Sequence, residues 1–340
     1  MSERLALATG AAGEMGHMLI PALKQRGFEV VTVDLETLPT ELAESCRECV
    51  DASILDDRAM HKLFAKYRFS QVFHLAAILS TKAEKDPGLA HRVNVEGTFG
   101  LYRLCLQQAE ETGTAPRLMF PSSIAVYGLP DASTKTAQGS VKESEWLVPS
   151  GMYGCNKLYC ELIGTYMSRN HGEGNSPTLD FRAIRFPGLI SSETLPTGGT
   201  TDYAPEMIHA AAQAKSYDCF VREDTRLPFM TMPDAVEALL RLADADASRL
   251  STRVYNIKAF SVSAGEIREA VLREFPDARI GFEPTVARQT IVDSWPEDVD
   301  DSLARRDWGL APRHGFAEAL GDYLLPALRE RYAGKAPAKP

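Results

Sequence analysis

Residues 5–16 read Leu5-Ala6-Leu7-Ala8-Thr9-Gly10-Ala11-Ala12-Gly13-Glu14-Met15-Gly16 and join an apolar run to a glycine-rich turn. A helical pattern, Met15–Arg26, follows directly, so the glycines lie in a strand–turn–helix context. Glycine permits the tight turn and the close approach of backbone to phosphate, and the helix N-terminus offers N–H groups to a pyrophosphate. Gly10, Gly13 and Gly16 therefore predict a dinucleotide-binding turn. The spacing G-x-x-G-x-x-G departs from the commoner G-x-G-x-x-G, and a merely flexible turn is the alternative.

The two strands that we expect next both end in an aspartate. Val30–Asp34 ends at Asp34, where a carboxylate can accept hydrogen bonds from ribose hydroxyls and repel a 2′-phosphate, which favours NAD over NADP. Glu48–Asp51 ends at Asp51, which can meet the adenine amino group, although a turn-forming aspartate explains the same residue nearly as well.

The first half of the chain alternates short apolar runs with helical patterns, which is typical of parallel βαβ units. The expected strands are Leu5–Thr9, Val30–Asp34, Glu48–Asp51, Val72–Ala76, Leu118–Ser122 and Leu179–Phe186, and the helices are Met15–Arg26, Asp57–Tyr67, Leu89–Glu111 and Met152–Asn170. Nearly continuous apolar strands indicate a sheet covered on both faces, so we predict an α/β fold with a doubly wound, Rossmann-type parallel sheet.

The alternation stops near residue 186, and this break predicts the domain organisation. We expect an NAD-binding domain over 1–186, a smaller C-terminal substrate-binding lobe over 187–333 that can return to the sheet, and a disordered tail over 334–340. The polar stretch Leu129–Ser150 is expected to form a surface loop at the mouth of the site.

Composition excludes several classes of function. With 37 lysines and arginines against 46 aspartates and glutamates, the net charge is −9, so no nucleic-acid partner is expected. No apolar run approaches the roughly 18 residues that span a bilayer, and the N-terminus lacks signal-peptide character, so no membrane partner is expected. Six scattered cysteines fit a reduced, cytoplasmic protein, and the lone Cys46–Cys49 pair is interpreted as packing, with no metal site.

Tyr153 and Lys157 lie four residues apart, on one face of the predicted helix Met152–Asn170. A free tyrosine has a pKa of about 10, but a neighbouring ammonium and a nicotinamide cation both favour the phenolate. Tyr153 can then take a proton from an alcohol while hydride leaves for the nicotinamide. Ser123 follows a strand at the ligand-binding edge of the sheet, where its hydroxyl can hold the substrate oxygen.

Together these motifs resemble the extended short-chain dehydrogenase/reductase superfamily along essentially the whole chain. The matching pieces are the glycine turn, His74-Leu75-Ala76-Ala77, Asn94-Val95-Glu96-Gly97-Thr98, Ser122-Ser123-Ile124-Ala125-Val126-Tyr127-Gly128 and Tyr153 with Lys157. The resemblance implies Ser123, Tyr153 and Lys157 as catalytic residues, and NAD contacts from Leu75, Ala76, Ala77, Asn94, Tyr153, Lys157 and Pro187. It also implies a homodimer formed through the helices Leu89–Glu111 and Met152–Asn170.

Strings in the second half are similar to one subfamily, the short-chain L-threonine 3-dehydrogenases. They are Arg185–Ser191, Gly199–Ala204, Leu227–Ala235, Arg288-Gln289, Asp293–Pro296 and Asp300–Arg305, with Ile78-Leu79-Ser80 in the first half. The resemblance implies NAD-dependent oxidation of the C3 hydroxyl of L-threonine to 2-amino-3-oxobutyrate. Two features depart from it: Ser150 stands where a threonine is expected, and Leu129–Ser150 is longer than usual.

A zwitterionic substrate needs partners for its carboxylate and its ammonium. Gly199, Thr200 and Thr201 precede a helical pattern whose N–H and hydroxyl groups can hold the carboxylate, although plain N-capping explains Thr201 equally well. Ser80 can reach the substrate from the opposite wall, or be an ordinary loop serine, and Trp295 can cover the substrate methyl group or pack within the lobe. Asp202 and Asp293 are equal candidates for the ammonium partner.

Three other functions fit parts of this pattern. A nucleotide-sugar 4-epimerase uses the same serine, tyrosine, lysine and NAD but needs a large nucleotide pocket in the second lobe. A dehydrogenase of a small hydroxy acid, such as an aldonate, has the same fold and needs only different substrate contacts in the second lobe. A regulator that senses NAD without chemistry has no use for Ser123, Tyr153 and Lys157 together, so it ranks last.

Overall fold

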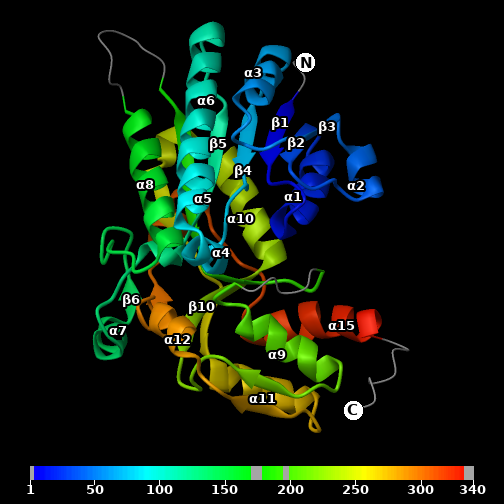
Figure 1. Ribbon diagram of the computed structural model, residues 1–340, viewed down its shortest axis with the longest axis vertical. Helices are drawn as coiled ribbons and strands as arrows, with labels where there is room; N and C mark the ends of the chain where they lie inside the picture. The colour runs from blue at the N-terminus through cyan, green and yellow to red at the C-terminus, as the bar shows by residue number, and fades with distance from the viewer. Residues whose placement is uncertain (1–3, 170–177, 194–198, 333–340) are drawn as a thin grey trace.

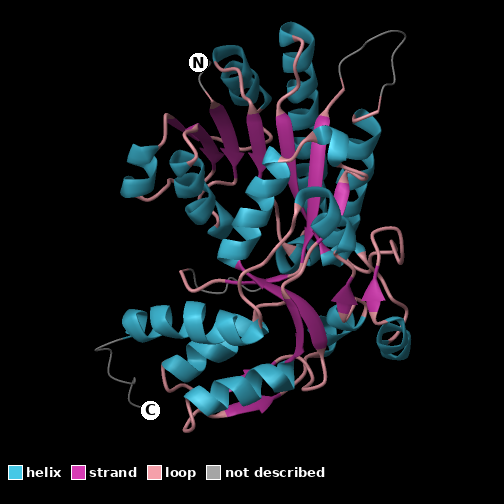
Figure 2. Cartoon of the chain, turned by 180° about the vertical axis from the view of Figure 1, so that it is seen from behind, coloured by secondary structure: helices cyan, strands magenta, loops and turns pink. Residues whose placement is uncertain are grey.

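The computed structural model describes residues 4–169, 178–193 and 199–332. Its centre is a parallel sheet of seven strands in the order β11-β7-β5-β4-β1-β2-β3. The bounds are β1 Leu5–Thr9, β2 Glu29–Asp34, β3 Glu48–Asp51, β4 Gln71–His74, β5 Arg117–Ser123, β7 Asp180–Phe186 and β11 Val254–Asn256. The predicted doubly wound parallel sheet is confirmed, because helices cover both faces (Figures 1 and 2).

Each face of the sheet has its own apolar core. One core packs the sheet against α3 (Asp57–Lys66), α6 (Thr98–Thr112) and α8 (Met152–Met167), and the other against α1 (Glu14–Gln25), α10 (Met232–Asp244) and α13 (Ser302–Trp308). Their apolar side chains recur at helical spacing, as Leu19, Ile20 and Leu23 do on α1. A π-helical turn, Arg92–Gly97, joins α5 (Pro87–His91) to α6, and α2 (Thr40–Ser45) and α4 (Ser80–Lys85) are short.

The second lobe lies below the carboxyl ends of the sheet strands in Figure 1. Its centre is the three-stranded sheet β12-β10-β8, with β8 Gly188–Ile190, β10 Arg226–Thr231 and β12 Phe260–Ser263. The helices are α9 Tyr203–Ala212, α11 Ala264–Glu274, α12 Val286–Asp293, α14 Phe316–Glu318 and α15 Leu325–Tyr332, and β9 Tyr217–Cys219 pairs with β13 Ile280–Phe282. A third apolar core fills this lobe.

The chain returns to the large sheet after it has entered the second lobe. The helix α10, the strand β11 and the helix α13 all come from residues beyond 186, yet they pack on or pair within the large sheet. Residue 186 is therefore not a boundary between two separately packed units. The division of the chain there into an NAD-binding domain and a substrate-binding lobe stays a prediction. The tail 334–340 lies outside the described residues.

The stretch Leu129–Ser150 differs from the surface loop that the sequence predicts. It contains α7 (Ala132–Gln138) and β6 (Ser140–Val141), and β6 pairs with β14 (Asp298–Val299) of the second lobe. Asp131 begins α7 by accepting the N–H of Thr134 at 2.7 Å, so the turn-forming residues here serve as a helix cap. None of the described helices combines the length and the apolarity that crossing a membrane requires.

Candidate active site

The candidate site lies where the strand order reverses, between β1 and β4, at the carboxyl ends that face the second lobe (Figure 1). Doubly wound folds bind ligands at this switch point, because the loops there diverge and leave a crevice. The glycine turn follows β1, and Leu75, Ala76 and Ala77 follow β4 as a partly exposed segment.

The glycine turn has the backbone geometry of a cradle. Gly10 has a φ of +68°, and a Cβ there would lie 2.4 Å from the backbone nitrogen of Ala76. A Cβ on Gly16 would lie 2.1 Å from the carbonyl oxygen of Ala11. Gly13 is the exposed N-cap of α1 and supplies no side chain to that helix end. The first turn of α1 therefore faces the crevice with its N–H groups and the positive end of its dipole, as a pyrophosphate requires.

Asp34 is fixed beside this turn. Its Oδ2 accepts the N–H of Ala12 at 2.8 Å, and its Oδ1 accepts the N–H of Glu36 at 3.0 Å. Each carboxylate oxygen has further acceptor capacity, so the arrangement fits a ribose diol. Asp51 lies opposite Asp34 in the pairing of β2 with β3 and is exposed.

Asn94 acts on the segment after β4 through its side-chain amide. Its Oδ1 accepts the N–H of Ile78 at 2.7 Å, and its Nδ2 donates to the Ile78 carbonyl at 3.0 Å and to Asn156 Oδ1 at 3.2 Å. Asn94 is buried, so these bonds hold the segment that carries Leu75, Ala76 and Ala77. A direct contact of Asn94 with a cofactor stays a prediction.

The structure brings the three predicted catalytic residues to one place. Ser123 ends β5, and its Oγ accepts the N–H of Ala125 at 3.1 Å, which leaves its own hydrogen for another acceptor. Helix α8 lies against the turn after Ser123, where a Cβ on Gly154 would be 2.0 Å from the Ala125 carbonyl oxygen. Glycine next to Tyr153 is therefore what allows the tyrosine and the serine to share a wall. The Nζ of Lys157 donates to the Pro121 carbonyl at 2.6 Å and lies 5.5 Å from the centroid of the Tyr153 ring.

In the chain without a cofactor, burial shifts the pKa values of both Tyr153 and Lys157. It raises the pKa of Tyr153, and it lowers the pKa of Lys157 to about 8. The sequence predicts that the Lys157 ammonium and the nicotinamide cation together favour the phenolate, but in the chain alone desolvation of the phenolate is the larger effect. The predicted lowering of the tyrosine pKa therefore depends on a further positive charge in the site.

Behind the wall formed by Ser123, Tyr153 and Lys157 lies a buried ion pair that the sequence did not predict. Glu161 and Arg185 are 2% and 3% exposed, and the Arg185 guanidinium donates through Nε and Nη2 to both carboxylate oxygens of Glu161. Ser122 Oγ donates to Glu161 at 2.5 Å, and Arg185 Nη1 donates to the Tyr127 hydroxyl at 2.8 Å. The available signal was the spacing, because Glu161 comes one helical turn after Lys157 and two arginines, Arg182 and Arg185, interrupt the apolar strand β7.

The predicted substrate residues come from both lobes. Ser80 at the start of α4 places its Oγ 3.0 Å from Thr200 Oγ1 in the second lobe. Gly199 donates its N–H to Asp202 Oδ2 at 2.7 Å, and a Cβ on Gly188 would lie 3.2 Å from Thr201 Cβ. The backbone after Pro187, which is buried, can therefore run close to Thr201.

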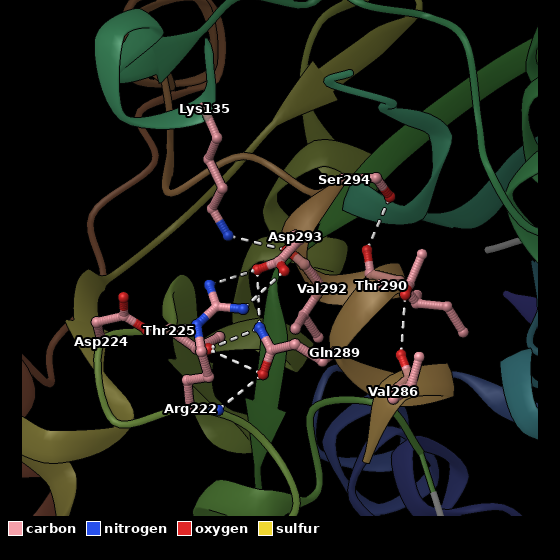
Figure 3. A network of polar contacts seen from close by, with 11 residues as sticks. Lys135, Arg222, Asp224, Thr225, Val286, Gln289, Thr290, Val292, Asp293 and Ser294 are labelled. Atoms are coloured by element: carbon pink, nitrogen blue, oxygen red, sulfur yellow. Dashed lines mark hydrogen bonds and ion pairs between the residues drawn. The ribbon is translucent and has the colours of Figure 1, made fainter. Parts of the chain in front are cut away.

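Two other candidates lie deeper in the second lobe. Trp295 is 6% exposed and belongs to the apolar core of the lobe. This placement agrees with the alternative in which Trp295 packs within the lobe. Asp293 receives two hydrogen bonds from Arg222, at 2.8 and 3.0 Å, and one from Gln289 at 2.7 Å (Figure 3). These bonds lower its pKa and occupy it within the lobe. Its role as the ammonium partner stays a prediction.

His74 sits beside the site but is occupied by neighbours. Its Nδ1 lies 2.7 Å from Thr9 Oγ1 and its Nε2 lies 2.8 Å from Thr98 Oγ1, and burial lowers its pKa to about 3. Such a neutral, doubly bonded imidazole ties β1 to α6. Within the described ranges no three histidine, cysteine, aspartate or glutamate side chains gather as a metal site would require.

A glycine cradle at the switch point of a doubly wound sheet, with serine, tyrosine and lysine along one wall, is typical of dinucleotide-binding enzymes that transfer hydride. The chain belongs to the NAD dependent epimerase/dehydratase family, whose model matches residues 6–257.

The relatives and solved structures that resemble the chain include several threonine dehydrogenases. The chain is 34% identical over 311 residues to the mitochondrial L-threonine 3-dehydrogenase of Bos taurus, across 91% of this chain and 78% of that protein. The structure of the Clostridium difficile L-threonine dehydrogenase superimposes with a TM-score of 0.87 at 30% identity, covering 98% of this chain and 100% of the other. A monomeric L-threonine 3-dehydrogenase from a metagenome gives 0.83 at 33% identity, covering 96% and 99%.

Proposed function

We propose that the protein oxidises the C3 hydroxyl of L-threonine with NAD⁺, giving 2-amino-3-oxobutyrate and NADH. The observation that carries this proposal is the extent of the likeness to threonine dehydrogenases, which includes the second lobe as well as the cofactor end. The matched region covers 91% of this chain in one relative and 98% in one structure, so the 30–34% identity spans the expected substrate lobe as well as the cofactor end.

The cofactor end fits NAD. The backbone around Gly10, Gly13 and Gly16 would lie against the pyrophosphate, Asp34 would accept the ribose hydroxyls, and Asp51 would face the adenine. A carboxylate at position 34 disfavours the 2′-phosphate of NADP by charge repulsion. The Leu75–Ala77 segment held by Asn94, and the backbone at Pro187, would line the nicotinamide half.

When bound, the oxidised nicotinamide accepts the hydride from C3, and the chain supplies orientation and proton transfer. Ser123 donates its hydroxyl hydrogen to the substrate oxygen, and Tyr153 accepts the proton of that hydroxyl. Burial raises the pKa of Tyr153, so the phenolate needs the ammonium of Lys157 together with the positive charge of the cofactor. The carbonyl of Pro121 keeps that ammonium in place.

Hydroxyls from the two lobes would hold the substrate. Ser80 and Thr200 already meet across the crevice, and Gly199 and Thr201 flank Thr200 in the segment just before α9. Hydroxyl and N–H donors there can bind the threonine carboxylate. Trp295 would act from the core of the lobe, as an apolar backing for this wall.

We also propose a homodimer formed through α6 and α8. These neighbouring helices expose large apolar side chains at positions that a monomer leaves in water: Phe99, Tyr159, Leu162 and Tyr166. Burying such a patch is favourable, and exposed patches of this kind often mark interfaces. One similar protein is described as monomeric, so the oligomeric state has to be measured. Analytical ultracentrifugation of the purified protein should show a dimer, and a monomer would contradict the proposal.

The reaction is tested by the absorbance of NADH. Purified protein with L-threonine and NAD⁺ should form NADH and 2-amino-3-oxobutyrate in equal amounts, with little turnover when NADP⁺ replaces NAD⁺. UDP-sugars and aldonates, offered in parallel, should give none. Conversion of a UDP-sugar to its 4-epimer would identify an epimerase instead, and NADH formation from an aldonate would identify a hydroxy-acid dehydrogenase.

A further inference from the structure

Helix α8, which carries Tyr153 and Lys157, begins without a capping side chain of its own. Its N-cap is Gly151, and the hydroxyl of the preceding Ser150 pairs with Ser294 Oγ at 2.7 Å. The first N–H groups of a helix need acceptors from outside the helix, and an unsatisfied first turn frays. The catalytic tyrosine is the second residue of this helix, so fraying there would move it.

The missing acceptor comes from α4. Glu84 Oε1 accepts the N–H of Met152 at 2.6 Å, which satisfies the residue directly before Tyr153. The absence of a side chain at Gly151 permits this approach, because a Cβ there would lie 2.9 Å from the same oxygen. A carboxylate at this end of α8 also faces the positive end of the helix dipole.

The same short helix reaches the opposite wall of the site. It begins at Ser80, whose hydroxyl meets Thr200 of the second lobe, and Glu84 is its fifth residue. Helix α4 thus connects the hydroxyls at the lobe boundary to the start of α8, and the two helices pack together. The ordinary roles of a surface glutamate, in solvation or in an ion pair along its own helix, do not require a 2.6 Å bond to another helix.

We propose that Glu84 is a positioning residue for Tyr153: its carboxylate caps α8 from outside and holds the tyrosine in the geometry for proton transfer. This inference rests on the proposed function for the reaction that it serves. A displacement of about 1 Å in a reacting group can cost up to about 100-fold in rate, so loss of the cap should act on turnover. Cofactor binding, which uses the glycine turn, should change little.

The test compares Glu84→Ala, Glu84→Gln and, as control, Glu110→Ala, which removes an exposed glutamate of α6. Amide hydrogen exchange at Met152 should accelerate about tenfold or more in Glu84→Ala, because its N–H loses its acceptor. The kcat should fall about tenfold while the KM for NAD⁺ stays within about twofold. Glu84→Gln keeps an amide oxygen as acceptor and should recover most of the kcat, whereas Glu110→Ala should match the unsubstituted protein.

Each outcome tests either the cap on α8, the positioning of Tyr153 or the proposed function. Unchanged exchange at Met152 in Glu84→Ala overturns the cap, and faster exchange with unchanged kcat overturns the positioning role. A fall in kcat that Glu84→Gln does not relieve assigns the effect to charge and overturns the hydrogen-bond argument. If Glu84→Ala fails to fold, Glu84→Met takes its place with the same expectations, because methionine keeps much of the side-chain volume but has no oxygen to accept the N–H of Met152. Absence of NADH formation by the unsubstituted protein would reject the proposed function, while the exchange measurement, which needs no substrate, still decides the cap.

Discussion

The two ends of the candidate site are built in different ways. The cofactor end is a backbone structure: one contiguous turn, Gly10 to Gly16, whose shape depends on the absence of side chains. The catalytic end is a side-chain structure assembled from α4, β5, α8 and β7, and it is supported by buried polar bonds. A backbone site fails when atoms are added, and a side-chain site fails when a partner is removed. Substitutions at the two ends should therefore affect different measurements.

The largest effect is expected from Tyr153→Phe, which removes one oxygen from the catalytic end. The kcat should fall by about 10³-fold, because phenylalanine has no oxygen to accept the alcohol proton and a positioned general base typically contributes about 10²–10⁴-fold. The dissociation constant of NAD⁺, measured by calorimetry, should stay within about twofold, since the glycine turn is untouched. If the Tyr153→Phe variant stays active, the hypothesis that Tyr153 is the base is wrong. Weakened NAD⁺ binding would show that the two ends are not independent.

The same contrast explains which parts of the molecule the sequence predicts. The first three strands and the glycine turn could be located because apolar runs and glycines act locally, and β1 and β3 have the bounds that the sequence predicts. The strand β11 was missed, because three residues are too few for a periodic signal and its place depends on a return from the second lobe. The helix α7 was missed because its sequence is polar, and it is held by contacts with distant residues.

In the candidate site too, features encoded by local spacing could be predicted, and contacts between distant residues could not. Ser123, Tyr153 and Lys157 could be proposed from spacing, and the structure places them together. The bonds between Glu161 and Arg185, and between Glu84 and Met152, join residues 24 and 68 positions apart, so no local pattern encodes them. The direction of the Tyr153 pKa shift was also beyond the sequence, because it depends on how much water the fold excludes.

The second-largest effect is expected in stability, from Glu161→Gln. The substitution keeps the shape of the side chain but leaves the guanidinium of Arg185 buried without its counter-charge. Removing one partner of a buried ion pair costs about 3 kcal/mol in the free energy of unfolding, measurable by urea denaturation. The control is Glu274→Gln, whose partner Arg329 is 64% exposed, and it should cost less than about 1 kcal/mol. Equal losses in the two variants would show that the pair behind the catalytic wall gives no special support.

A smaller effect is expected from Gly10→Ala, which adds one methyl group to the cofactor end. The positive φ alone costs about 1–2 kcal/mol for an L-residue, and the new Cβ would collide with the backbone at Ala76. Relief of that collision must move the turn, so NAD⁺ should bind about tenfold more weakly or worse. Gly27→Ala is the matched control: its φ is +77° but nothing lies within 4 Å, so it should lose stability alone and keep its NAD⁺ affinity. Equal NAD⁺ affinity in the two variants would contradict the cradle.

The smallest effect is expected away from both ends of the site, in the second lobe, where α7 contacts α12. Lys135 is 3% exposed, and its Nζ donates to the Val292 carbonyl at 2.9 Å, next to the Arg222–Asp293 pair (Figure 3). Burial lowers the pKa of Lys135 to about 8, although Glu297, Asp293 and Asp224 oppose the shift. The unfolded chain, with an ordinary lysine pKa near 10.5, therefore holds more protons than the folded one between about pH 8 and 10.

It follows that the free energy of unfolding gains a contribution from Lys135 as the pH rises through this window, by up to about 1.4 kcal/mol per pH unit. Lys157, whose pKa is also lowered to about 8, contributes with the same sign. In Lys135→Met the slope of stability against pH should be reduced but not abolished, because the Lys157 contribution remains. Urea unfolding at pH 8, 9 and 10 measures the slope, with Lys142→Met, at an exposed position of the same stretch, as control. An unchanged slope in Lys135→Met would mean that Lys135 keeps an ordinary pKa, and that the α7–α12 contact is open to water.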